Sequence, residues 1–184
     1  MTLLAGQNIQ LAALPYPAVA PRRDRHRVTR LQAGGKLNAA ANHQLLTYGA
    51  ELASGHDMTL TSGNNMRFES LLNEEHQGGG DNFSYRKLQQ PTQLSSGGVL
   101  TLISNGSILF QATQLVAKSV MDIAAEGGYL FAQAMEETSH SEARWTTRKW
   151  YGRKKSHHNV QHAASNKVTE FTAEGDISLL SRDD

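Results

Sequence analysis

The chain has 184 residues and a formal net charge of +1, and it contains no cysteine. The length suits one domain with its own core, and the low aromatic share of 7% with 16 glycines favours short strands and turns over helices. The composition excludes disulfide bonds, thiolate nucleophiles and cysteine-ligated zinc sites, and no run approaches the roughly 20 apolar residues of a membrane-spanning helix.

Glycine-led strand units recur along the whole chain. Each unit is a glycine, one or two residues that are often polar, and then apolar residues in alternation, and the units begin at Gly6, Gly35, Gly55, Gly63, Gly98, Gly106, Gly128 and Gly175. Alternation with a period of two places Met58 and Leu60 on one face of a strand and Thr59 on the other. The glycine before each strand is expected to supply the positive φ of a sharp corner.

The glycines also repeat at a fixed distance. Gly34 and Gly55 are 21 residues apart, as are Gly106 and Gly127, and the distance from Gly55 to Gly97 is twice that. One strand pair cannot bury its apolar face alone, whereas stacked coils align each strand with its copies about 4.8 Å away. We therefore expect an all-β fold, a parallel β-helix of about 21-residue coils with extra-helical loops or hairpins. A β-sandwich would lack the fixed coil length.

Polar residues at the corners of the coils have structural roles in this prediction. The asparagines concerned are Asn8, Asn64, Asn65 and Asn105. Their amide side chains are expected to form hydrogen bonds along the rod from one coil to the next. Asp57, Asp122 and Asp176 stand beside the starts of strands, where turn chemistry accounts for them.

Three segments interrupt the repeat, near 13–30, 72–93 and 136–168. All four prolines of the chain fall in the first two of them. Because proline cannot donate a ladder hydrogen bond, these segments are expected to leave the coils, and such excursions often carry the binding surface of a solenoid. The remaining residues suffice for about five or six coils without a recognisable polar cap. Residues 1–184 are therefore expected to be one β-helix segment of a longer array.

The first excursion contains a secondary basic cluster. Its members are Arg22, Arg23, Arg25, Arg27 and Arg30, which with Asp24 give residues 22–30 a balance of +4. The cluster either adds to an anion-binding surface or is a solvated loop. The sequence leaves open whether it shares a face of the rod with the third excursion.

The third excursion contains a basic segment, residues 144–155, with a balance of +6 and no acid, which leaves the chain outside the two clusters at −9. The candidate contacts for an anionic ligand are Arg144, Trp145, Arg148, Lys149, Trp150, Tyr151, Arg153, Lys154 and Lys155. Cations interleaved with aromatic rings suit sulfated glycans, anionic lipid headgroups or nucleic acid. The alternative is a solvated hairpin whose rings pack on the rod. We expect a protruding β-hairpin that turns at Gly152, between 145–151 and 160–171.

Three stretches of the chain resemble the haemagglutinin repeats of two-partner-secreted exoproteins: residues 52–66, 136–140 and 148–155. That family includes filamentous haemagglutinin adhesins, haemolysin-like exoproteins and contact-dependent growth-inhibition effectors. The resemblance implies a right-handed β-helix, export through a partner outer-membrane transporter barrel, and a secreted protein at the surface of a Gram-negative bacterium. It implies no catalytic residues.

The sequence shows no arrangement of residues typical of an enzyme. It lacks the Gly-x-Ser-x-Gly elbow of a serine hydrolase, and its carboxylates are scattered rather than paired. His157, His158 and His162 have spacings that suit a metal, but no acid or cysteine lies nearby in the sequence to complete a set of ligands. We therefore expect no catalytic residue, no metal and no cofactor.

The function that these features favour is that of a structural and adhesive stalk segment of a secreted bacterial surface exoprotein, not an enzyme. Its expected contacts are a host or neighbouring-cell surface, through sulfated glycans or anionic lipid, and no specific nucleic acid. One alternative is the stalk of a growth-inhibition effector that helps to deliver a C-terminal toxin. Another is a β-helix polysaccharide lyase, which would need a carboxylate or basic cluster in a groove on one face.

Overall fold

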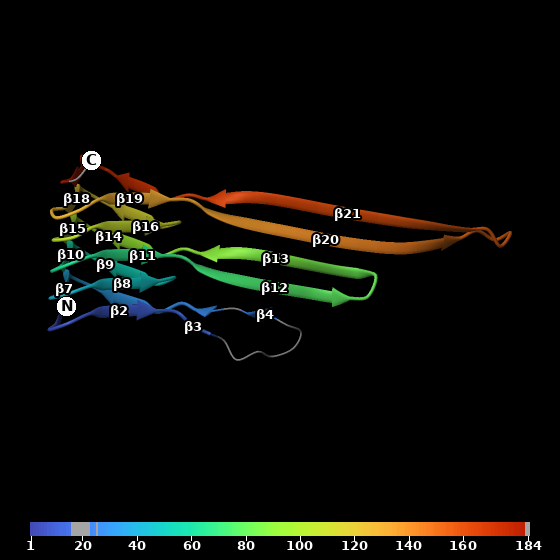
Figure 1. Ribbon diagram of the computed structural model, residues 1–184, viewed down its shortest axis with the longest axis horizontal. Coiled ribbons are helices and arrows are strands. Elements are labelled where there is room, and N and C mark those ends of the chain that lie inside the picture. Colours follow the sequence, from blue (N-terminus) through green and yellow to red (C-terminus); the bar gives the residue numbers. More distant parts are fainter. Residues whose placement is uncertain (16–22, 25, 183–184) are drawn as a thin grey trace.

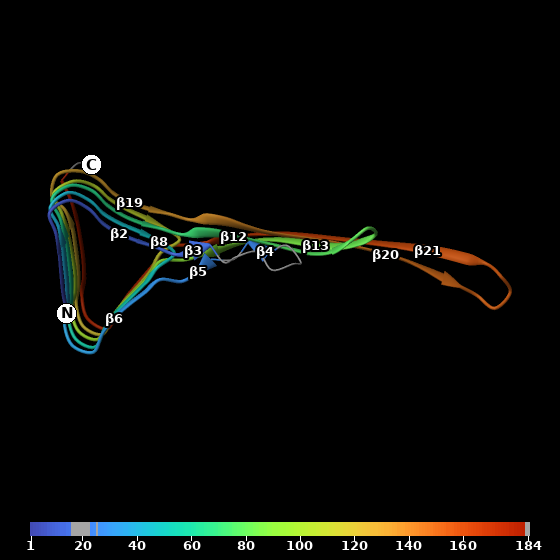
Figure 2. The ribbon, with the colours of Figure 1, turned by 90° about the horizontal axis from the view of Figure 1, so that it is seen from below.

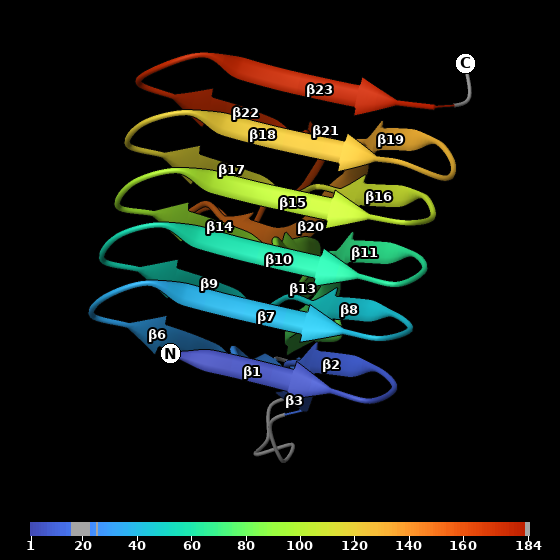
Figure 3. The same cartoon turned by 90° about the vertical axis from the view of Figure 1, so that its left-hand side faces the viewer.

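The structure is a computed structural model that describes residues 1–15, 23–24 and 26–182. Within these residues the chain forms strands and no helix. Most strands belong to three parallel sheets. Strands of successive coils stack along one axis in each sheet, and the three sheets form the walls of a rod with a roughly triangular outline (Figure 2, Figure 3). The predicted all-β fold, a parallel β-helix, is confirmed.

Each wall takes one strand from each coil. The first wall contains β1 (Thr2–Ala5), β7 (Leu37–Ala41), β10 (Met58–Ser62), β15 (Leu100–Ser104), β18 (Met121–Ala125) and β23 (Ile177–Ser181). The second wall contains β2 (Ile9–Ala12), β8 (Leu45–Tyr48), β11 (Met66–Glu69), β16 (Ile108–Gln111) and β19 (Leu130–Gln133). The third wall contains β6 (Arg30–Ala33), β9 (Glu51–Ser54), β14 (Gln93–Ser96), β17 (Gln114–Ala117) and β22 (Glu170–Ala173). The described chain thus makes five coils and begins a sixth with β23.

The register of the walls aligns equivalent apolar side chains along the rod. Met58 pairs with Leu37, which is 21 positions earlier, and Leu100 pairs with Met121, which is 21 positions later. All four of these side chains are fully buried. Fully burying a side chain of this size stabilises the fold by roughly 1.5–3 kcal/mol. The buried apolar side chains of the three walls form one core cluster along the rod.

Most of the strand-leading glycines are required by the close stacking of the coils and not by positive φ, whereas a Cβ atom at Gly6 or Gly35 would meet nothing within 4 Å. Within the described residues the glycines with positive φ are Gly49, Gly78, Gly80 and Gly152. Gly49 stands at the corner before β9, and none of the eight glycines that begin the predicted strand units has a positive φ. A Cβ atom at Gly55 would collide with the carbonyl oxygen of Gly34 in the preceding coil, and one at Gly97 with that of Gly55. The prediction of positive φ at these corners is therefore wrong. Glycine is needed at Gly55 and Gly97 because a carbonyl group of the neighbouring coil occupies the space of a side chain.

Polar side chains at the corners bridge one coil to the next. This prediction is confirmed for Asn8, whose side-chain oxygen accepts a hydrogen bond from the backbone N–H of Gln44 at 3.0 Å, and for Asn65, and it stays a prediction for Asn64 and Asn105. The Asn65 side-chain oxygen accepts a hydrogen bond from the backbone N–H of Ser107 at 2.8 Å. The Asp57 carboxylate lies 2.9 Å from Lys36 Nζ and accepts a hydrogen bond from the backbone N–H of Val99 at 3.1 Å. These bonds, that from Lys36 first, hold the pKa of Asp57 below its ordinary value.

The chain leaves the coils three times, each time at the corner between the second and third walls (Figure 2). The first excursion contains β3 (Leu14–Pro15), β4 (Arg23–Asp24) and β5 (His26–Arg27), the second contains β12 (Leu71–Gly79) and β13 (Asn82–Gln90), and the third contains β20 (Met135–Arg148) and β21 (Lys154–Lys167). They come from the first, third and fifth coils. The second and fourth coils cross the same corner directly, through Gly49–Ala50 and Ala112–Thr113.

Buried threonines line this corner inside the rod. Thr92 follows the second excursion, and its hydroxyl donates to the carbonyl oxygen of Glu69 at 2.7 Å. Thr113 in the next coil donates to the carbonyl oxygen of Phe68 at 2.8 Å. Both side chains are fully buried, so these hydrogen bonds satisfy hydroxyl groups that would otherwise be costly to bury.

The excursions join into one antiparallel sheet, here called the hairpin sheet, with the strand order β21-β20-β13-β12-β4 (Figure 1). Neighbouring strands lie about 4.8 Å apart, so a hairpin covers about 9.6 Å along the rod, which is also the rise of two coils. A hairpin from every second coil therefore meets the next one without a gap.

The arms of the third hairpin differ from the sequence prediction. Residues 160–171 were expected to form one returning strand, but β21 ends at Lys167 and Phe171 lies in β22 of the rod. There the ring of Phe171 contacts that of Phe110 edge-on at 5.3 Å between centroids. The hairpin strand is largely polar, whereas β22 alternates polar and apolar residues and places Phe171 against the core.

Candidate binding site at the hairpin tip

The longest hairpin ends in a tight turn formed by Trp150, Tyr151 and Gly152. The backbone N–H of Gly152 donates to the carbonyl of Lys149 at 2.9 Å, and the N–H of Lys149 donates to the carbonyl of Arg153 at 2.9 Å. Gly152 has a φ of 87°, which a three-residue hairpin loop with a glycine bulge requires and which side chains with a Cβ rarely adopt. The turn predicted at Gly152 is thus present, and it places two aromatic side chains at the apex.

Cations face one another across the tip. Arg148 pairs directly with Lys154 in the strand register, Lys155 pairs with Thr147, and Lys149 and Arg153 close the turn. Like charges placed directly opposite on two strands destabilise the pairing. Within the described chain none of these five cations takes part in an ion pair. The tip therefore concentrates positive charge without a described counter-charge.

The two aromatic rings at the apex are exposed to solvent. Trp150 is 96% exposed and Tyr151 is 54% exposed. Their rings meet nearly at right angles, at 86° with 5.7 Å between centroids, and Lys149 Nζ lies 5.7 Å from the centre of the Tyr151 ring. A shallow hollow of about 380 Å³ lies beside them, lined by Lys149, Tyr151, Arg153, Lys154 and Lys155. The rings do not pack on the rod, contrary to the alternative that the sequence left open.

Arg144 and Trp145, which the sequence grouped with the tip, lie farther back on the hairpin. Arg144 forms ion pairs with Glu142 at 2.8 Å and with Asp81 of the neighbouring hairpin at 3.9 Å. The Trp145 ring stacks on His157 with 5.1 Å between centroids and 6° between planes. The positive charge of Arg144 is thus partly neutralised, and seven of the nine predicted residues form the tip.

Glu142 organises this part of the hairpin. It lies 2.7 Å from His158 Nε2 on the opposite strand. This hydrogen bond, together with the charge of Arg144, holds the pKa of Glu142 below its ordinary value. His157 and His158 are consecutive residues of a strand and so point to opposite sides of the sheet, and within the described residues no group of three or more His, Cys, Asp or Glu side chains is placed to bind a metal ion.

The described arginines of the secondary basic cluster lie apart from the tip. Arg22 and Arg25 lie outside the described residues, and Arg23 belongs to β4, which forms the edge of the hairpin sheet opposite β21. Arg27 is exposed on β5, and Arg30 lies on the rod in an ion pair with Glu51. The described arginines of this cluster are therefore spread over three elements.

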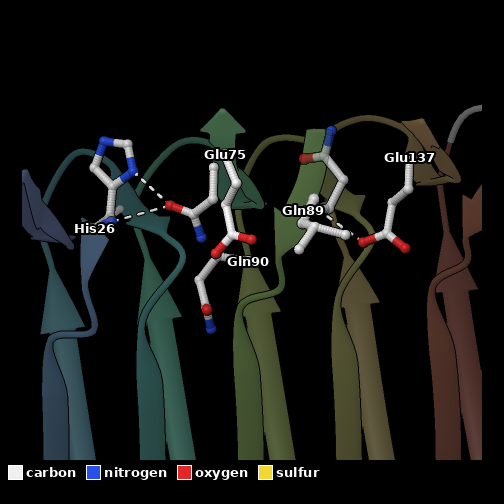
Figure 4. A pocket seen from close by; sticks show the side chains of 7 residues that line it. His26, Glu75, Gln89, Gln90 and Glu137 are labelled. Atoms are coloured by element: carbon white, nitrogen blue, oxygen red, sulfur yellow. Dashed lines mark hydrogen bonds between the residues drawn. The ribbon is translucent and has the colours of Figure 1, made fainter. Parts of the chain in front are cut away.

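A second hollow, of about 460 Å³, lies where the hairpins leave the rod (Figure 4). It is lined by His26, Asn73, Glu75, Leu88, Gln89, Gln90 and Glu137. The Asn73 side-chain oxygen accepts a hydrogen bond from the backbone N–H of His26 at 2.9 Å, and the Glu137 carboxylate accepts one from the backbone N–H of Gln89 at 2.8 Å. These bonds join all three excursions at their bases, so we assign the hollow a structural role.

No sequence motif indicated this junction, because its residues come from segments far apart in the chain.

None of the described residues forms a helix with the length and apolar character to cross a membrane.

Comparison with known proteins adds no relative. No protein-family model matches the chain, and neither a curated protein nor a solved structure does. The resemblance to haemagglutinin repeats, and with it the right-handed sense of the coil, stays a prediction.

Proposed function

We propose that this chain is a structural and adhesive segment of a cell-surface protein. The coils act as a stiff rod, and the longest hairpin presents its cationic aromatic tip to anionic groups on another surface. One observation carries the proposal: Arg148 and Lys154 face each other at the far end of a hairpin, next to three more cations that have no described ion-pair partner. Sulfate or phosphate groups bound between these cations would offset their mutual repulsion.

The rod supplies rigidity for such a display. Each inner strand of a wall is hydrogen-bonded to its copies in the coils before and after it, as in Met58 with Leu37 and Leu100. The hairpin sheet is in turn braced at its base, where β20 pairs with β13 through Asn82–Lys87. The tip is therefore held at a fixed direction from the rod axis.

Retention of the full chain on immobilised heparin tests the anion-binding part of the proposal. Replacing Arg148, Lys149, Arg153, Lys154 and Lys155 by alanine should shift elution to much lower salt, because exposed charges attract a polyanion over about 10 Å at moderate ionic strength. A matched pair of double variants sharpens the test. Lys154→Ala with Lys155→Ala should weaken retention clearly more than Lys118→Ala with Lys167→Ala, which removes the same charge away from the tip. Equal retention of wild type and the five-residue variant would contradict this part.

The cellular setting belongs to the same proposal. From the resemblance of residues 52–66, 136–140 and 148–155, we propose that the segment belongs to a secreted exoprotein that reaches the bacterial surface through a partner outer-membrane transporter barrel. Protease added to intact cells of the source organism should then degrade the protein. Full protection until the cells are lysed would contradict a surface location.

A further inference from the structure

We propose that the surface contacted by the tip is an anionic lipid bilayer, and that Trp150 and Tyr151 insert into its interface. This inference rests on the proposed function, because it names the partner of the same tip. It commits to lipid rather than to a sulfated glycan for three reasons: the order of residues along the tip, the geometry of the two rings, and the reach of the hairpin.

The residues of the tip follow the order that a bilayer interface favours. The apex consists of the uncharged residues Trp150, Tyr151 and Gly152, and Lys149 and Arg153 follow immediately behind it. At a bilayer surface tryptophan and tyrosine rings sit at the level of the headgroups, with one end in an apolar and the other in a wet environment. Lysine and arginine around them meet the lipid phosphates and keep their charged groups in water.

The geometry of the rings suits insertion better than stacking against a sugar. Trp150 and Tyr151 stand at 86° to each other in edge contact, so the two rings do not form one flat platform on which neighbouring sugar rings could stack. Lys149 Nζ also lies 5.7 Å from the centre of the Tyr151 ring. Trp150 is 96% exposed, so nearly its whole apolar surface is open to a partner that surrounds it, as an interface does.

The reach of the hairpin lets the tip touch a flat surface before any other described part of the molecule. The arms of this hairpin pair over 14 residues, against nine for the hairpin of β12 and β13. At roughly 3.3 Å per residue the longer arm extends about 45 Å, and Figure 1 shows its tip beyond every other described element. A bilayer that approaches end-on therefore meets Trp150 first.

Charge then determines which bilayers bind. Four cations lie within three residues of the apex pair, namely Arg148, Lys149, Arg153 and Lys154, and a fifth, Lys155, lies one position farther. Each cation near an anionic surface strengthens binding roughly fivefold. We therefore expect binding to vesicles that contain phosphatidylserine, and little binding to vesicles of phosphatidylcholine alone.

Tryptophan fluorescence of the full chain tests the insertion directly. The chain has two tryptophans, so the variant Trp145→Phe leaves Trp150 as the sole reporter and keeps an aromatic ring against His157. With phosphatidylserine vesicles its emission should shift to the blue, and brominated lipids should quench it. Trp150→Ala should lower the partition coefficient several-fold, whereas Trp145→Phe should leave it close to wild type.

Heparin retention and vesicle binding together show whether the lipid inference, the anionic contact or both are wrong. If the protein is retained on heparin through the tip cations but does not bind vesicles, the lipid inference is overturned and the anionic contact stands. If vesicles bind without a blue shift of Trp150, adsorption is purely electrostatic and insertion is overturned. Binding to neither heparin nor vesicles would overturn both.

Discussion

Glycine is required at a corner where the neighbouring coil leaves no space for a side chain. A Cβ atom at Gly97 would overlap the carbonyl oxygen of Gly55, whereas one at Gly35 would meet nothing within 4 Å. Both glycines lie at corners of the coils, and neither has a positive φ. The two positions therefore separate the effect of crowding from that of backbone flexibility.

Gly97→Ala should destabilise the protein by about 1–3 kcal/mol, because an overpacked site forces the two coils apart. Gly35→Ala should be neutral or stabilise it by up to about 1 kcal/mol, because alanine restricts the unfolded chain. Urea unfolding followed by circular dichroism measures both. Equal destabilisation by the two substitutions would show that corner glycines serve backbone freedom after all.

Single residues also decide which part of the basic segment is free to bind. Arg148 and Arg144 are both arginines of β20, four positions apart. Arg144 lies beside Glu142 and Asp81, whereas the neighbour of Arg148 across the strands is Lys154. The residue type is the same, and the surrounding charge makes one arginine structural and the other a candidate contact.

At the scale of elements, the tip of the longest hairpin combines a stable turn with an unfavourable charge pair. Gly152 and two backbone hydrogen bonds fix the turn, while Arg148 lies opposite Lys154. The positive charge of Lys154 therefore weakens the hairpin, because it repels Arg148, while it strengthens the attraction of the tip for anions. One substitution can separate them.

Lys154→Glu should stabilise the hairpin by about 0.2–1 kcal/mol, because it turns a like-charge pair into an opposite pair, and should weaken retention on heparin. Lys155→Glu is the matched control: its cross-strand neighbour is Thr147, so it should weaken retention without stabilising the hairpin. Amide hydrogen exchange of β20 and β21 reports the first effect and the eluting salt concentration the second. Stronger retention of either variant would contradict a role for these cations in anion binding.

At the scale of the whole molecule, the hairpin sheet depends on the alternation of coils with and without excursions. The second coil crosses the corner through Gly49–Ala50, whereas the third coil inserts β12 and β13 at the same place. Through that insertion β13 pairs with β20 along Asn82–Lys87. The rod and the hairpin sheet are thus two structures with separate sources of stability, an apolar column and a set of strand pairs.

Replacing residues 70–91 by a single glycine would give the third coil a two-residue corner, with Thr92 kept in place. The rod should still fold, because its walls and buried threonines are unchanged. Strand β20 should lose protection from hydrogen exchange over residues 138–143, since its partner β13 is gone, while the wall strands β10 and β15 keep theirs. Loss of protection in the walls as well would show that the rod needs the hairpin sheet.

The sequence by itself determined the coils and the chemistry of the tip. Glycine-led alternation at a 21-residue spacing predicted parallel stacking, because each strand can bury its apolar face only against its own repeat. The cations of 148–155 and the turn at Gly152 were also visible, since both depend on residues close together in the chain.

Tertiary structure alone decided how the excursions fit together. Strand β13 pairs with β20, and Arg144 contacts Asp81, so segments more than 50 residues apart are joined. These polar strands contain no sequence repeat from which the pairing could be predicted. The physical reason is axial spacing: a hairpin is as wide as two coils are high. The match between hairpin width and coil rise depends on the stacking of the coils. It lets β13 pair with β20 and so supports the hairpin that presents the cationic tip.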